Sequence, residues 1–207
     1  MATEEKLYLY PLWLRVWHGI NALGIITLIV TGISMQYASD QFSILRFDVA
    51  VNLHNVAGIT VSVFYLLFFL GNLFTNNKKF YRIKSKGFGE RLMKQARYYT
   101  YGMFKGETCP FPVSEKRKFN PLQKYSYVVV MYVLVPVIVI TGIALLFPEL
   151  IIDEVYSLSG VMLTAVFHGI AGFLVFIFLL IHLYVASIGK SPKDNFKGII
   201  TGWHSKA

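Results

Sequence analysis

The stretch VMLTAVFHGIAGFLVFIFLLIHLYVASI, from Val161 to Ile188, decides the fold of this chain. It contains no Asp, Glu, Lys or Arg, but it carries two histidines, His168 and His182. A helix rises about 1.5 Å per residue, so an apolar run of this length can cross a hydrocarbon core of about 30 Å. The stretch therefore predicts a transmembrane helix with two ionisable side chains inside it.

Three further apolar runs are long enough to span a membrane: Trp13 to Met35, Ala50 to Phe74 and Tyr125 to Phe147. The first carries Arg15 and His18 near its start and no small-residue cleavage site follows it, so we expect a retained helix and not a secretory signal. Across the chain, 55% of residues are hydrophobic and 15% are charged, more apolar than a soluble domain of this length. We expect an all-α protein, with residues 1–207 forming one integral membrane four-helix bundle.

Nearly all basic residues lie on one side of the predicted membrane. Thirteen of the twenty lie between residues 75 and 124. The tail adds Lys190, Lys193, Lys197 and Lys206. The connections at 36–49 and 148–160 instead carry Asp40, Asp48, Glu149, Asp153 and Glu154 against Arg46 alone. Because Lys and Arg stay in the cytoplasm, both termini and the middle connection are predicted to be cytoplasmic. Topology thus explains the net charge of +9, and we expect membrane lipid but no nucleic acid as a partner.

Part of the middle connection has helical periodicity. Leu92, Ala96, Tyr99 and Met103 fall on one face, which predicts an amphipathic cytoplasmic helix on the membrane surface. The alternative is a solvated charged loop. The single cysteine, Cys109, excludes an internal disulfide and a Cys-ligated iron–sulfur cluster within this chain.

Four of the five histidines lie inside predicted spans. An ionisable side chain in hydrocarbon suggests a functional site, although a single one can also be a hydrogen-bonded packing residue. His168 and His182 are fourteen residues apart, which is a rise of about 21 Å and nearly four whole turns. Following the topology, His54 shares the outer level with His168, and His18 shares the inner level with His182. The predicted pairs are therefore His54 with His168 and His18 with His182.

Two imidazoles facing each other across a helical bundle are the ligands of a six-coordinate haem. A small residue follows each histidine by four positions: Ala22, Gly58, Gly172 and Ala186. Such a residue lies beside the histidine and leaves space for a porphyrin edge. Two histidines are too few for a closed zinc site. The pattern thus predicts two b-type haems that carry electrons, with Arg15 either pairing with a haem propionate or reaching the lipid headgroups.

Four parts of the sequence form a pattern together: Trp17-His18-Gly19-Ile20-Asn21-Ala22, Leu53-His54 with Gly58, Phe119-Asn120-Pro121-Leu122-Gln123-Lys124, and His168 with His182-Leu183-Tyr184. In these segments the chain resembles the di-haem cytochrome b subunits of bacterial respiratory complexes. This group includes the gamma subunit of formate dehydrogenase and the cytochrome b of nickel–iron hydrogenases and thiosulfate reductases. The resemblance covers nearly the whole chain.

The resemblance implies a membrane-anchor electron-transfer subunit of the bacterial inner membrane. Electrons would pass between a quinone, menaquinone or ubiquinone, and a periplasmic catalytic, iron–sulfur or multihaem cytochrome subunit. In the family an Asn-x-x-Gln segment borders the quinone, which points here to Asn120, Leu122 and Gln123; some members have Gly at the position of Leu122. Read without the family, Asn120-Pro121 is an ordinary turn and helix start.

Two other functions remain open from the sequence. One is a stand-alone four-helix cytochrome b that oxidises a small outer substrate such as superoxide and reduces quinone. The other is a transporter whose histidines relay protons or bind metal. Co-purification with a catalytic subunit favours electron transfer, and activity of the isolated chain favours the stand-alone enzyme. Quinone turnover is the only chemistry assigned to the chain itself.

Overall fold

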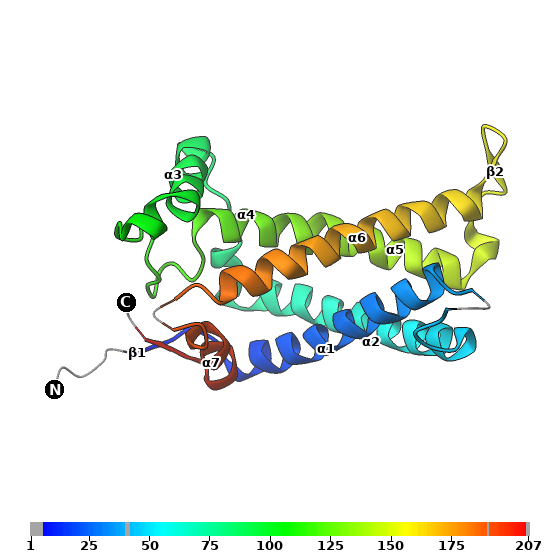
Figure 1. The fold of residues 1–207 in the computed structure, drawn as a ribbon, viewed down its shortest axis with the longest axis horizontal. Helices are drawn as coiled ribbons and strands as arrows, with labels where there is room; N and C mark the ends of the chain where they lie inside the picture. Colours follow the sequence, from blue (N-terminus) through cyan, green and yellow to red (C-terminus); the bar gives the residue numbers. More distant parts are fainter. Residues whose placement is uncertain (1–5, 40–41, 190, 206–207) are drawn as a thin grey trace. The chain divides into compact units, whose positions relative to one another are not determined.

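The computed structural model describes residues 6–39, 42–189 and 191–205. Asp40, Lys190 and Lys206, which contribute to the charge asymmetry, lie outside the described residues. Four helices are long and apolar enough to cross a membrane: Leu12–Gln36, Phe47–Phe74, Pro121–Leu146 and Gly160–Ala186 (Figure 1). All four begin and end within a few residues of the predicted runs, which confirms the all-helical fold with four candidate spans.

The third span differs from the other three. The first, second and fourth are single α-helices: α1 (Leu12–Gln36), α2 (Phe47–Phe74) and α6 (Gly160–Ala186). The third consists of α4 (Pro121–Val129), the π-helical turn η3 (Val130–Leu134) and α5 (Val135–Leu146). Pro136, the second residue of α5, has no backbone N–H to donate, so the regular hydrogen-bond ladder is interrupted at this point.

The chain divides into two compact units, one of which consists of Val16–Leu70 and Tyr132–Leu180. Within this unit α1 and α2 pack closely. The Trp17 Nε1 donates to the Phe64 carbonyl at 2.8 Å, and the Trp17 ring stacks on Phe68 with centroids 4.4 Å apart. A Cβ added at Gly24 would lie only 2.5 Å from Val61 Cγ2. Small residues allow such approaches between membrane helices.

Gly24→Ala is expected to destabilise the protein, because its methyl group overlaps the buried Val61 side chain. Overpacking of this kind costs about 1–3 kcal/mol. Thermal unfolding in detergent measures the effect. Gly19→Ala in the same helix is the matched control, since a Cβ there meets no heavy atom within 4 Å. Equal unfolding temperatures for the two variants would contradict the close α1–α2 contact.

The other unit consists of Met1–Arg15, Gly71–Met131 and Ile181–Ala207. Its short elements are β1 (Lys6–Tyr8), η1 (Asn76–Phe80), α3 (Phe88–Thr100), η2 (Gly102–Lys105), α7 (Asp194–Thr201) and β4 (Trp203–Ser205). Strand β1 pairs antiparallel with β4, with Leu7 opposite His204. Strands β1 and β4 therefore lie side by side, which agrees with an even number of spans. Gly202 (φ 90°) supplies the left-handed turn into β4.

The predicted helix of the middle connection is present as α3, so the alternative of a solvated loop is wrong. Leu92, Ala96 and Tyr99 lie half-buried on the same side as the fully buried Gln95. This side packs against α4, and the Tyr99 hydroxyl accepts a hydrogen bond from Asn120 Nδ2 at 2.7 Å. The apolar face of α3 is thus covered at least partly by protein, and its contact with a membrane stays a prediction.

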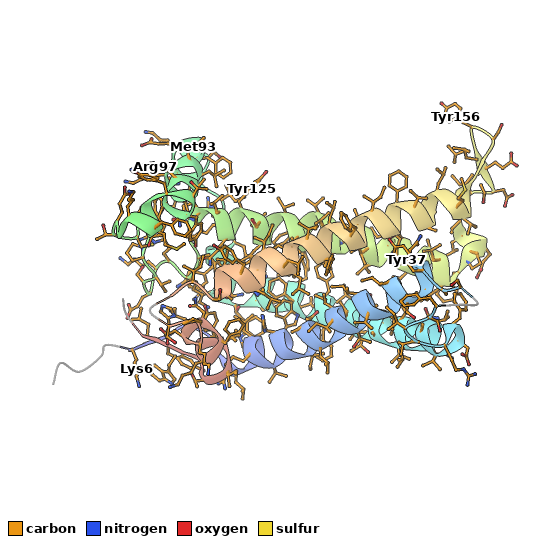
Figure 2. All side chains as sticks on the ribbon, viewed as in Figure 1. Lys6, Tyr37, Met93, Arg97, Tyr125 and Tyr156 are labelled. Atoms are coloured by element: carbon orange, nitrogen blue, oxygen red, sulfur yellow. The ribbon has the colours of Figure 1, made fainter. Side chains whose placement is uncertain are left out.

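The connection between α5 and α6 forms a small hairpin. After η4 (Pro148–Leu150), β2 (Glu154–Val155) pairs antiparallel with β3 (Leu158–Ser159). Both residues of its turn, Tyr156 and Ser157, have positive φ angles of 50° and 64°, as the tight hairpin turn requires. Tyr156 is 98% exposed and extends away from the helices (Figure 2).

Candidate functional site

Two of the four predicted ligands come together. His54 on α2 and His168 on α6 are half-buried, and their ring centroids are 6.1 Å apart with an interplanar angle of 67°. A metal–imidazole bond is about 2 Å long and the ligating nitrogen lies about 1 Å from its ring centre, so rings on opposite sides of one iron have centres about 6 Å apart. The pair therefore fits the two axial positions of a haem iron.

Each of these imidazoles has a threonine partner on a neighbouring helix. Thr31 Oγ1 lies 2.9 Å from His54 Nδ1, and Thr141 Oγ1 lies 2.9 Å from His168 Nδ1. Both hydroxyls donate their proton to a carbonyl four residues earlier, at 2.7 Å. The threonine oxygens are then left to accept from Nδ1–H. We assign the Nδ1-protonated tautomer, which keeps the Nε2 lone pair for a metal.

A glycine follows each threonine and makes room for the imidazole. A Cβ at Gly32 would lie 3.6 Å from His54 Cε1, and one at Gly142 would lie 3.2 Å from His168 Cε1. The sequence reasoning missed the threonines. The available signal was the tripeptide Thr-Gly-Ile, which occurs at residues 31–33 and again at 141–143. Each copy supports the histidine of the helix that follows in the chain.

The small residues that follow His54 and His168 by four positions leave space. A Cβ added at Gly172 would meet no heavy atom within 4 Å, and one at Gly58 would make only an ordinary contact of 3.8 Å with Leu28. Ala22 lies within α1, and the Ala186 carbonyl near the end of α6 accepts from Asn195 Nδ2 at 3.1 Å. In the described part of the chain, no three His, Cys, Asp or Glu side chains gather as a bare metal-ion site does.

His18 and His182 are half-buried like His54 and His168. His182 Nδ1 lies 3.3 Å from the Tyr127 hydroxyl of α4, and the two rings meet edge to face with centroids 5.8 Å apart. The Phe119 ring also meets the Tyr127 ring edge to face, with centroids 4.9 Å apart. A third imidazole thus has a hydroxyl partner at Nδ1. His18 belongs to one compact unit and His182 to the other, and their pairing stays a prediction.

The remaining predicted site residues have structural roles. The Arg15 guanidinium donates to the Ile200 carbonyl of α7. Asn120 and Gln123 form a capping box at the start of α4: Asn120 Oδ1 accepts from the Gln123 N–H at 2.9 Å, and Gln123 Oε1 accepts from the Asn120 N–H at 3.1 Å. Leu122 is half-buried in the same turn. The helix-start interpretation of this segment is confirmed, and a quinone contact stays a prediction.

The sequence matches known protein families over almost its full length. The family model for prokaryotic cytochrome b561 matches residues 9–202. The putative cytochrome YdhU of Escherichia coli K12 is 36% identical over 97% of this chain and 75% of that protein. A probable Ni/Fe-hydrogenase B-type cytochrome subunit of Rhizobium leguminosarum is 26% identical over 88% of this chain and 81% of that protein. With four apolar helices and a histidine pair at haem-ligating distance, the chain belongs to the prokaryotic cytochrome b561 family and is a membrane b-type cytochrome.

Proposed function

We propose that this chain is the membrane-anchor subunit of a respiratory oxidoreductase and carries electrons through two bis-histidine b haems, between a partner on the outer side and the quinone pool. The observation that carries the proposal is the His54–His168 pair, with its 6.1 Å separation and matched threonine partners. Haem iron held by two imidazoles supplies one-electron transfer. The chain contributes the ligands, their fixed tautomer and an apolar surrounding.

The second haem is assigned to His18 and His182. Support comes from α6, which carries both His168 and His182 along one uninterrupted helix, so that their separation of about 21 Å is set by helix geometry. The Tyr127 hydroxyl orients His182 as Thr141 orients His168. A polar partner at the second ring nitrogen restricts the orientation of a ligating imidazole.

Two observations support a protein partner on the outer side: the charge of the connecting segments and the name of one relative. The connections at 36–49 and 148–160 are short and acidic, and they face the outer side in the predicted topology. The Rhizobium relative is named as a subunit of a Ni/Fe hydrogenase. We infer a periplasmic catalytic, iron–sulfur or multihaem subunit that docks on this side.

The quinone, menaquinone or ubiquinone, is proposed at the start of the third span, beside Asn120, Leu122 and Gln123. The capping box gives Asn120 and Gln123 a role that does not require a quinone. A useful substitution therefore has to keep the helix cap and change only the proposed quinone contact. Gln123→Glu keeps an oxygen that can accept from the Asn120 N–H, and it is expected to preserve the helix start while changing quinone reduction. Unchanged quinone kinetics in Gln123→Glu would argue against a contact at this residue.

The experiment that tests the proposal is a pyridine haemochrome spectrum of the purified chain, combined with protein quantification. Two b haems per chain are expected, and a quinol analogue is expected to reduce them. A chain that purifies folded but binds no haem would overturn the proposal. Co-purification of a catalytic or multihaem subunit from native membranes tests the anchoring role separately.

Gly142→Ala is expected to disturb the outer haem. Its Cβ would lie 3.2 Å from His168 Cε1, which is tighter than ordinary van der Waals contact, so the imidazole has to move by a few tenths of an ångström. A shifted midpoint potential or a lower content of one haem reports the change. Gly32→Ala is the matched control, since its Cβ would make an ordinary 3.6 Å contact with His54. Identical redox titrations of the two variants would contradict this reading of the glycines.

A further inference from the structure

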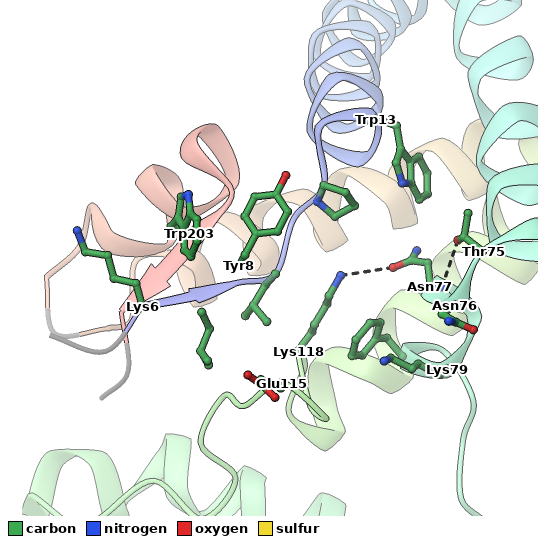
Figure 3. Close-up of a pocket in the computed structure, with 14 residues that line it drawn as sticks. Lys6, Tyr8, Trp13, Thr75, Asn76, Asn77, Lys79, Glu115, Lys118 and Trp203 are labelled. Carbon is green, nitrogen blue, oxygen red and sulfur yellow. Dashed lines mark hydrogen bonds between the residues drawn. The ribbon is translucent and has the colours of Figure 1, made fainter.

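The unit that contains both terminal segments has a pocket of about 620 Å³ (Figure 3), a volume typical of ligand sites. Of the residues that the structure describes, three lysines line it, Lys6, Lys79 and Lys118, against a single acidic residue, Glu115. The walls include the apolar side chains of Trp13 and Phe80. The pocket therefore combines an excess of positive charge with apolar surface. Neither the haem ligands nor the proposed quinone residues line it.

Lys118 is the unusual member of this set. It is only 7% exposed, whereas Lys6 and Lys79 are exposed at the rim. Among the residues that the structure describes, no carboxylate forms an ion pair with Lys118. A buried ammonium without an opposite charge is costly. Burial, together with the nearby Lys79, lowers the pKa of Lys118 to about 8.

The side chains in direct contact with the Lys118 ammonium are neutral: Asn77, Phe80 and Tyr10. Its Nζ lies 3.5 Å from Asn77 Oδ1, a long hydrogen bond visible in Figure 3. Asn77 is held in place because its Nδ2 donates to Asn72 Oδ1 at 2.7 Å. The ammonium also lies 4.3 Å from the ring centroid of Phe80 and 5.5 Å from that of Tyr10. These contacts fix the position of the charge but do not neutralise it, which leaves it available for an anion.

The position of the pocket indicates which anion. Trp13 lies in the first turn of α1, and Thr75, another lining residue, directly follows α2. The pocket is therefore at the ends of two membrane spans, where phospholipid headgroups lie and where Trp is enriched. A lysine ammonium is a compact donor suited to phosphate oxygens. Apolar walls beside it suit the glycerol and upper acyl carbons of a lipid.

We propose that this pocket binds the phosphate of an anionic phospholipid, with Lys118 as the buried counter-charge and Lys79 and Lys6 at the rim. Binding would neutralise the buried ammonium and join the N-terminal segment, η1 and the segment before α4 through one ligand. The inference rests on the pocket and its lysines, and it holds whether or not the chain carries two haems.

Native mass spectrometry of the delipidated full chain tests the proposal, with phosphatidylglycerol as the probe. Phosphatidylcholine, which has no net charge, and inorganic phosphate are the comparison arms. Wild-type chain is expected to retain phosphatidylglycerol in preference to phosphatidylcholine. Because lipid and haem have different masses, lipid binding and haem content are read separately in the same spectrum.

Lys118→Gln is expected to weaken phosphatidylglycerol binding by more than about tenfold, since it removes a buried charge that contacts the ligand. Lys116→Gln is the matched control, with the same charge change two residues away on an exposed side chain, and it is expected to leave binding unchanged. If Lys118→Gln does not fold, Lys79→Gln at the exposed rim replaces it, with an expected loss of about two- to fivefold.

Three outcomes would overturn the lipid assignment. They are equal retention of the two lipids by the wild type, equal phosphatidylglycerol binding by Lys118→Gln and Lys116→Gln, and, where Lys118→Gln does not fold, equal binding by Lys79→Gln and Lys116→Gln. Inorganic phosphate that displaces phosphatidylglycerol at low concentration would instead assign the pocket to a soluble phosphate compound. Loss of phosphatidylglycerol binding in Lys118→Gln at unchanged haem content supports the proposal.

Discussion

Replacement of His168 by alanine is expected to remove one of the two proposed haems and to leave the other. An imidazole from a single helix is a weak anchor for a non-covalently bound haem, because one axial ligand and half of the orienting contacts are lost. His54→Ala is expected to remove the same haem, since the two rings face each other at 6.1 Å. The haemochrome content of each variant, and its low-temperature absorption spectrum, measures the loss.

A double variant of His54 and His168, and single variants of His18 and His182, extend this test. His54→Ala combined with His168→Ala is expected to lose no more haem than either single variant, because both residues serve one site. His18→Ala and His182→Ala are expected to remove the other set of signals. His204→Ala, at the paired chain ends, is the control with full haem content. Four intraspan variants that all keep the full spectrum would overturn the ligand assignment.

Replacement of Thr141 by valine is expected to change the haem proposed at His54 and His168, called the outer haem, without abolishing it. Valine has nearly the same shape but no oxygen, so His168 Nδ1 loses the acceptor that it has at 2.9 Å. Loss of such a partner typically costs about 10–100-fold in metal affinity. The imidazole also becomes a poorer electron donor to iron, which disfavours the oxidised form. The midpoint potential of the outer haem is therefore expected to rise, on the order of tens of mV, since a tenfold change is about 59 mV for one electron.

Redox titration followed at the haem absorption bands measures this change. Thr141→Ser, which restores the hydroxyl, is expected to recover the wild-type potential. Thr31→Val is expected to act in the same direction through His54, whose Nδ1 contact has the same length. Thr60→Val is the control, because the Thr60 hydroxyl donates only to the Val56 carbonyl of its own helix. A potential that is unchanged in both Thr31→Val and Thr141→Val would show that the threonines are packing residues.

The four spans were predictable because each is a long apolar run, and the membrane allows few alternatives to a helix. The third span began four residues earlier than expected, at Pro121, since the Asn120 cap and the first helical turn are polar and fall outside a hydropathy signal. The pairing of His54 with His168 followed from counting residues and from topology. Depth along a helix is fixed by the 1.5 Å rise, so it can be derived without any side-chain contact.

The features that the sequence did not reveal depend on contacts between distant segments. Strands β1 and β4 are three residues each and pair across nearly the whole chain, and such short strands have no local signature. The Thr-Gly-Ile tripeptides were visible, but a three-residue match is too short to stand out as a repeat. The role of the tripeptide becomes clear only from the imidazole that each copy contacts. The pocket around Lys118 likewise needs four separate segments to come together.

The pairing of β1 with β4 has a consequence for biosynthesis. Lys6 of β1 is the register partner of Ser205 of β4. The two-stranded ribbon that they form cannot close until β4 has left the ribosome. All four hydrophobic helices are synthesised before β4. They can therefore be inserted into the membrane while β1 has no pairing strand. Closure of the ribbon is thus expected to be a late step of maturation, and a nascent chain stalled before residue 203 would lack it.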